Sequence, residues 1–226
     1  MESSIRKNWL VAAVLIALAV LLWHEIGHVR DSLRIIEAHN DLKWIGFALH
    51  EYHDRHGSFP PSVVRDEHGN AIHSWRSIID QDLNSIVNEG KRYRAYDFSS
   101  PWNSKANSQT DAQRSPGDRP YQFLTVVDPR AVWNENGSRS MKEITDGTSH
   151  TLLAIGVRDT GVKWHQPLDA TMTVDGGLEV DGRRLDLSHD FFVLLADGSV
   201  RHTMGLAPDV LSALLTIDGN EKLPEW

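Results

Sequence analysis

The stretch His189-Asp-Phe-Phe-Val-Leu-Leu-Ala-Asp-Gly-Ser-Val-Arg201 has the pattern of a β-hairpin. Phe191 to Ala196 is a short apolar run rich in strand-forming residues, and the Asp-Gly pair after it favours a tight turn because glycine accepts a positive φ. Val200 to Thr203 then returns as the second strand. The stretch predicts an antiparallel pair in the last third of the chain. Hairpins are common, so this pattern alone assigns no function.

The sequence around the hairpin predicts a small, mostly antiparallel sheet with short helices. A C-terminal helix is expected to begin at Pro208, since proline suits the first helical position, and to end near Asp218-Gly219. Helices and strands that are segregated along the chain indicate an α+β fold. We expect further strands at Tyr121–Val127, Thr151–Val157 and Leu178–Val180, a short helix at Trp75–Val87, and a flexible surface loop near residues 99–120, rich in Ser, Asn, Gln and Pro.

The N-terminal quarter of the chain predicts one long helix. Trp9 to Trp23 is an unbroken apolar run. Further along, apolar residues recur at spacings of three, four and seven, which is one face of a helix. Gly57 and Pro60-Pro61 are helix-ending residues. We therefore expect a helix from about Asn8 to His56, with a core-facing stripe made by Ile35, Leu42, Ile45, Leu49, Tyr52 and His56.

The start of this helix is predicted to be a membrane anchor. The apolar run is shorter than the roughly 20 residues that span a bilayer, but His24 to Val29 extends it as helix. Arg6 and Lys7 precede the run and acidic residues follow it, which places the N-terminus in the cytoplasm. The alternative is a cleaved signal peptide, since Ala17-Leu-Ala19 fits a cleavage site. That site lies inside the apolar run, which favours an uncleaved anchor.

Composition limits the remaining functions. The 226 residues suffice for one moderate domain and an anchor. A net charge of −8 argues against nucleic-acid binding, which needs clustered Lys and Arg. The chain has no cysteine, which excludes disulfides and thiolate metal sites.

The segment His24-Glu-Ile-Gly-His28 matches the His-Glu-x-x-His pattern of zinc metalloproteases. Residues four apart share a helix face, so both imidazoles can bind one zinc ion, with Glu25 as general base. A third protein ligand is needed, and the metzincin extension is missing because Asp31 and Arg34 stand at its positions. We therefore expect interfacial polar residues here, and keep a zinc-dependent membrane hydrolase as the alternative.

Other candidate sites carry weaker signals. Ser149 and His150 suggest a nucleophile pair, but neighbours on a strand point to opposite faces. An acidic group could bind calcium, which prefers carboxylate oxygens; its members are Asp175, Asp181, Asp186, Asp190 and Asp197. Most of these aspartates lie in turns, where local side-chain hydrogen bonds explain them, and no EF-hand spacing is present. The last candidate is the helical set His50, His53 and His56, for which packing against the sheet is the simpler interpretation.

Several phrases together carry a family resemblance. They occur in order over about residues 42–221, which is most of the chain. The chain resembles a bacterial pilin-like family, domain of unknown function 1559, which has a His…Asp-Gly signature near its C-terminus. The phrases are Leu49-His-Glu-Tyr-His-Asp-Arg-His-Gly-Ser-Phe-Pro-Pro61, Ser74-Trp-Arg76, Ile144-Thr-Asp-Gly-Thr-Ser-His-Thr-Leu-Leu153, the hairpin quoted above, and Leu211-Ser-Ala-Leu-Leu-Thr-Ile-Asp-Gly-Asn-Glu221.

The resemblance implies a pseudopilin-like architecture, a long membrane-embedded helix carrying a small sheet domain, and no known catalysis. The chain departs from it in two places. Seven residues separate His189 from Asp197 where the family signature has nine, so no role is assigned to that histidine. The usual Gly-Phe-Thr-Leu-x-Glu processing site is replaced by Arg6-Lys-Asn-Trp9, so cleavage by a prepilin peptidase is not expected.

Taken together, the sequence predicts a single-pass protein of the bacterial inner membrane. We expect a cytoplasmic N-terminus at 1–8, an anchor at 9–28, a helical continuation at 29–57 and an extracytoplasmic pilin-like domain at 58–226. The expected function is structural or interaction-based, within or related to type II secretion or type IV pilus assemblies, with the bilayer, self-association or envelope proteins as partners. No catalytic, cofactor or metal residues are expected. The alternatives are the zinc hydrolase at 24–28 and a ligand-binding envelope module using the 99–120 loop.

Overall fold

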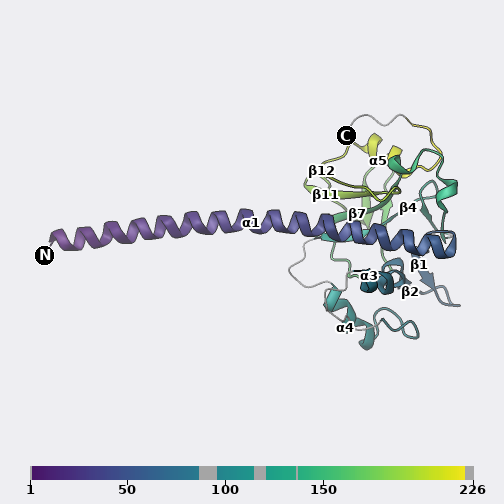
Figure 1. Ribbon diagram of the computed structural model, residues 1–226, viewed down its shortest axis with the longest axis horizontal. Helices are drawn as coiled ribbons and strands as arrows, with labels where there is room; N and C mark the ends of the chain where they lie inside the picture. The colour runs from purple at the N-terminus through teal and green to yellow at the C-terminus, as the bar shows by residue number, and fades with distance from the viewer. Residues whose placement is uncertain (1, 87–95, 115–120, 136, 222–226) are drawn as a thin grey trace. The chain divides into compact units, whose positions relative to one another are not determined.

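The computed structural model describes residues 2–86, 96–114, 121–135 and 137–221, with the side chains of 2–8, 10–14, 84–86 and 111–114 outside that part. It shows an α+β protein with a long N-terminal helix and mostly antiparallel sheets, which confirms the predicted class (Figure 1). The chain forms two compact units, Met1–Glu37 and Ala38–Trp226, and the second contains both large sheets.

Helix α1 spans Glu2–His56. Within the second unit, Leu42, Ile45 and Leu49 of the predicted stripe are at most 2% exposed, whereas Tyr52 is half-buried and His56 is exposed. The helix ends where Gly57 takes a φ of 79° and its N–H donates to the carbonyl of His53 at 2.7 Å. Glycine adopts this left-handed conformation without strain, so the predicted helix end is confirmed.

The central sheet has four antiparallel strands in the order β12-β11-β7-β3. Phe191 to Leu195 are all buried because both faces of β11 are covered. On one face, Leu194 meets α1 at Gly46. On the other, Phe191 packs in a core with Leu214 of α5. The elements are β3 (Tyr121–Leu124), β7 (Leu152–Arg158), β11 (Asp190–Leu195), β12 (Val200–Met204) and α5 (Pro208–Leu215).

A second sheet has the order β10-β9-β8-β4-β5-β6 and includes two parallel pairs, β4 with β5 and β4 with β8. The single strand predicted at 121–127 is divided between the two sheets at Thr125. Its N–H donates to the side chain of Asp169 and its hydroxyl donates to the carbonyl of Leu153, while its own carbonyl accepts from the N–H of Ala170 in β8. The elements are β4 (Val126–Val127), β5 (Trp133–Asn134), β6 (Gly137–Ser138), β8 (Ala170–Met172), β9 (Leu178–Val180) and β10 (Arg183–Arg184).

The helix predicted at Trp75–Val87 forms two helices separated at Ile79, and Val87 lies outside the described residues. The region predicted as a loop near 99–120 instead contains α4. Its first turns are fixed by the buried side chain of Asn107, which donates to three backbone carbonyls. The remaining elements are β1 (Val63–Arg65), β2 (Ala71–Ser74), α2 (Trp75–Ile78), α3 (Asp80–Ile86), α4 (Lys105–Arg114), and the 3-10 helices η1 (Met141–Glu143) and η2 (Thr148–His150).

Over the residues that the structure describes, no helix contains a stretch that is both long and apolar enough to cross a membrane. The predicted anchor at 9–28 includes residues 10–14, whose side chains fall outside that part of the structure.

Candidate functional site

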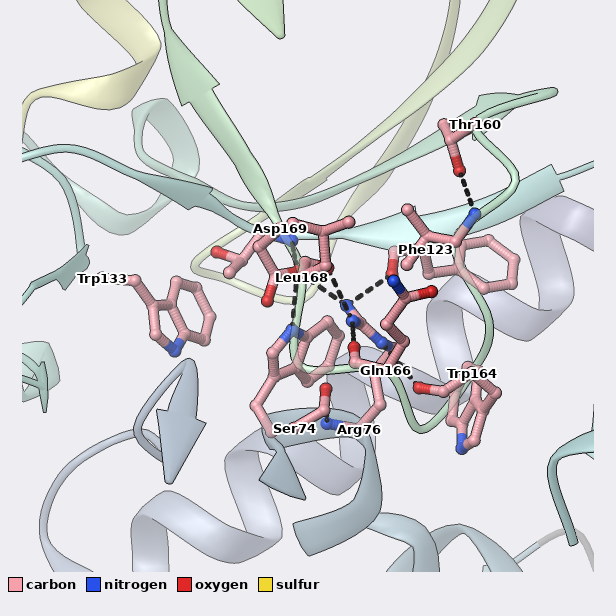
Figure 2. A network of polar contacts seen from close by, with 12 residues as sticks. Ser74, Arg76, Phe123, Trp133, Thr160, Trp164, Gln166, Leu168 and Asp169 are labelled. Carbon is pink, nitrogen blue, oxygen red and sulfur yellow. Dashed lines mark hydrogen bonds and ion pairs between the residues drawn. The ribbon is translucent and has the colours of Figure 1, made fainter. Parts of the chain in front are cut away.

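The phrase Ser74-Trp-Arg76 builds a buried polar network, shown in Figure 2. The side chains of Arg76 and Asp169 are each 1% exposed, and Nη1 of Arg76 lies 2.6 Å from Oδ1 of Asp169. Ser74 caps α2 by accepting a hydrogen bond from the N–H of Arg76 at 3.2 Å. This cap fixes the start of the short helix and, with it, the direction of the guanidinium.

Arg76 also donates to four backbone carbonyls from two separate segments. A guanidinium has five N–H donors in a fixed plane, so one side chain can hold several acceptors at once. The contacts join α2 to the end of β3 and to the loop before β8. The acceptors are the carbonyls of Phe123 at 3.0 Å, Trp164 at 2.8 Å, Gln166 at 2.6 Å and Leu168 at 2.9 Å.

Asp169 is the acceptor at the centre of the network. Besides Arg76, its Oδ1 accepts from the indole N–H of Trp75 and from the N–H of Thr125, both at 3.0 Å. Burial raises the pKa of Asp169, while the charge of Arg76 and these hydrogen bonds act in the opposite direction. Because the ion pair is enclosed, it can take part in no reaction with a solute, and its role is to connect the two sheets.

The phrase around His53 forms a second structural connection. The ring of His53 lies 5.0 Å from Phe59, which lies 5.6 Å from Trp133, and Trp133 in turn lies 6.2 Å from Trp75. At the α1 end of this row, Nε2 of His53 accepts a hydrogen bond from the N–H of Met141 at 3.1 Å. The row therefore links the end of α1 to the buried Arg76 network.

Asp146 joins two further phrases of the family resemblance. Its carboxylate accepts hydrogen bonds from the N–H groups of Gly219 at 2.7 Å and Asn220 at 2.8 Å. It thereby ties the Asp-Gly turn before β7 to the segment after α5. The contacts of Asp146 are therefore structural, like those of Arg76 and His53.

A groove of about 590 Å³ lies between α1 and the β11–β12 turn. Its aromatic wall is formed by Trp44 and Phe47, which are 42% and 51% exposed. His50 closes one end, with Nδ1 at 2.7 Å from the carbonyl of Gly46 and Nε2 at 2.9 Å from that of Ala196.

His24 and His28 come together as the spacing predicts. Their Nε2 atoms are 3.1 Å apart and their ring centroids 4.5 Å apart, with the rings at 89° to each other. Both side chains and Glu25 are exposed. Among the described residues, no group of three or more His, Asp or Glu side chains is arranged to hold a metal ion.

Four of the five candidate aspartates are held by separate local partners, and the fifth, Asp181, lies in a turn. Asp186 and Asp197 accept hydrogen bonds from the serines two residues further on, and Asp190 binds His202 at 2.9 Å. Asp175 binds Arg184 at 2.5 Å, and hydrogen bonds from Thr173 and Arg184 lower the pKa of Asp175 to about 2. Asp181 occupies a turn with a φ of 50°.

Asp186 and Asp190 line one cavity of about 370 Å³, to which β7 and β11 of the central sheet and β9 and β10 of the second sheet contribute residues. The same cavity is lined by Arg158, Arg183 and the exposed His189, which approaches Asp186 at 3.1 Å. The cavity therefore carries mixed charge, and the other candidate aspartates do not line it.

The helical histidines do not converge on a common point. His50 and His53 bind the partners given above, and Nδ1 of His56 lies 2.8 Å from the carbonyl of Tyr52. This arrangement agrees with the packing interpretation.

The orientation expected for Ser149 and His150 is wrong. The two residues belong to η2 rather than to a strand, so their side chains meet, with Oγ at 3.3 Å from Nδ1.

Sequence reasoning missed a buried contact between Ser77 and His165. The Oγ of Ser77 lies 3.1 Å from Nδ1 of His165, and both residues are at most 1% exposed. The ring of Tyr96 covers His165, with centroids 4.5 Å apart. The two residues are 88 positions apart in the chain, and no local pattern relates them.

Comparisons with known proteins give one match. No curated protein and no solved structure matches this chain. Residues 28–126 match the model of a family described as a protein of unknown function, DUF1559. This segment holds the second half of α1, the Ser74-Trp-Arg76 phrase and β3. The chain is thus similar, over this segment, to a family whose function is unknown.

Proposed function

We propose that this protein is a single-pass, membrane-anchored structural or interaction protein of the bacterial envelope, with a pilin-like domain outside the cytoplasm. One observation carries the proposal: the large apolar side chains between residues 15 and 22 are exposed around α1. Leu15, Ile16 and Leu18 are 61%, 64% and 50% exposed, and Leu21 and Leu22 are 61% and 63% exposed. A helix that is apolar all round belongs in a lipid or protein interior.

The residues at the two ends of this apolar segment support a membrane position. Trp9 and Trp23 are 73% and 76% exposed, and tryptophans are enriched where a helix meets the two lipid headgroup regions. Basic residues lie on both sides of the segment, Arg6 and Lys7 before it and Arg30 and Arg34 after it. The proposed orientation, with the N-terminus in the cytoplasm, therefore follows from the pilin-like architecture and not from the flanking charges.

The second unit supports an interaction role rather than catalysis. The residues of the family phrases, among them Arg76, His53 and Asp146, are engaged in connections between elements. A pilin-like architecture is supported by the packing of α1 on the central sheet, where its buried residues face β11. In a pilin-like protein, a long helix carries a small sheet domain in this way. The exposed Trp44 and Phe47 provide an aromatic surface beside that sheet.

Membrane extraction tests the anchor. Wild-type chain expressed in bacteria should stay in the membrane pellet after washing at alkaline pH. The double variant L18R/L22R places two charges in the apolar segment, each costing about 2.5–3.5 kcal/mol at a helix centre, and should move to the supernatant. The matched control L33R/I36R changes two equally exposed apolar residues beyond the predicted anchor and should stay in the pellet. Release of the wild type, or equal behaviour of both variants, contradicts the proposal.

A further inference from the structure

His24 and His28 are already arranged as two ligands of a transition-metal ion. Zinc binds histidine nitrogen at about 2.0–2.1 Å with tetrahedral geometry. Two nitrogens that are 3.1 Å apart can both reach one such ion with an angle of about 98° at the metal, near the tetrahedral value. Both side chains are exposed, so an ion can reach them from solution. One helix supplies two of the four ligands.

The position of the pair on α1 indicates where the other two ligands come from. Ala17, Leu21, His24, His28 and Asp31 follow each other at spacings of four, three, four and three residues. This is the heptad spacing of a and d positions, which form the contact line of paired helices. The small side chain of Ala17 and the exposed Leu21 lie on the same line as the two histidines. A second helix packed here meets both histidines.

We propose that two copies of this chain bind one zinc ion through His24 and His28 of each copy. In a parallel pair, equivalent a and d residues face each other across a twofold axis, so the four imidazoles surround one point on that axis. The parallel alignment rests on the proposed function, because anchors inserted with the same orientation are parallel. Glu25 lies about 100° around the helix from His24 and is not on the contact line.

The experiment uses full-length protein without an affinity tag, in detergent, with zinc as the probe. Bound zinc and molecular mass are measured together by native mass spectrometry over a zinc titration. We expect one zinc per two chains and a dimer fraction that rises with zinc. The variant H28V/V29H keeps the residue content but moves one imidazole off the contact line, and should bind zinc at least tenfold more weakly. H24A/H28A should remove the effect.

Three results would overturn this inference: one zinc per chain in a monomer, equal zinc binding by wild type and H28V/V29H, or a dimer fraction that does not respond to zinc. Near-ultraviolet circular dichroism of the second unit shows that each variant is folded. The membrane extraction above is independent of this measurement. A chain released at alkaline pH but dimerised by zinc refutes the anchor alone, and an anchored chain indifferent to zinc refutes the metal site alone.

Discussion

The substitution Arg76→Met is the sharpest test of the buried network. Methionine is close to arginine in length and fills the space without donors. The substitution leaves the carboxylate of Asp169 without its charge partner in a buried site, since the side chains of Arg76 and Asp169 are each 1% exposed. It also leaves four backbone carbonyls without the guanidinium that they accept from.

The expected cost follows from removing one member of a buried ion pair, which is about 3–5 kcal/mol. For a unit of this size, about 2–4 °C of melting temperature is lost per kcal/mol, so the midpoint should fall by about 6–20 °C. Burial raises the pKa of Asp169, and the variant lacks the opposing charge of Arg76, so the pKa of Asp169 should be raised further in the folded variant. The cost of the substitution should therefore increase as the pH rises above the ordinary range of Asp.

Thermal unfolding, for the midpoint, and urea unfolding, for the free energy, are both followed by near-ultraviolet circular dichroism of the tryptophans on full-length protein in detergent. Arg130→Met is the matched control, because Arg130 pairs with Asp128 at 3.0 Å but is 51% exposed, and such a pair contributes at most about 1 kcal/mol. The double variant R76M/D169L should recover part of the loss, since it removes the unpaired charge. A cost for Arg76→Met no larger than for Arg130→Met would refute the structural role of the network.

Two other predictions concern packing and charge. Gly46→Ala should destabilise the second unit by about 1 kcal/mol in urea, because the new Cβ meets Cδ1 of Leu194 at 2.8 Å and overpacking outweighs the gain in helix propensity; Gly27→Ala, which meets nothing within 4 Å, should not. The carboxyl of Asp175 should titrate near pH 2 in carbon NMR. Its contribution to folding stability is therefore fully present at pH values above the ordinary pKa of Asp and is lost as the pH falls through about 2. Arg184→Gln should move that midpoint upward, and an unchanged midpoint would contradict the pairing.

The fold class and most elements could be predicted from local patterns. The buried position of Leu42, Ile45 and Leu49 on α1 and the end of α1 at Gly57 are confirmed, as are the hairpin of β11 and β12 and the C-terminal helix α5. These elements are determined by nearest neighbours in the chain, such as an Asp-Gly turn or a proline at a helix start. Hydrophobic spacing and turn residues in the sequence are therefore enough to predict these elements.

The elements missed by sequence reasoning depend on distant partners. Thr125 divides a predicted strand because its N–H donates a hydrogen bond to the side chain of Asp169. Asp169 is 44 positions away, so the sequence around Thr125 does not predict this contact. Asn107 stabilises the first turn of α4 although the composition of this stretch is typical of a loop. Its side-chain amide donates to three backbone carbonyls that precede the helix. The phrase containing Arg76 was recognised, but its role depends on Asp169, 93 positions away.

The location of the second unit tests the central claim most directly. Alkaline phosphatase, which folds only outside the cytoplasm, is fused to the C-terminus of the full chain, and a fluorescent protein that matures inside is fused to a parallel copy. The account predicts an active phosphatase and a dark fluorescent fusion, with activity lost in L18R/L22R. An inactive phosphatase with a bright fluorescent fusion would place the domain in the cytoplasm and contradict the proposed anchor.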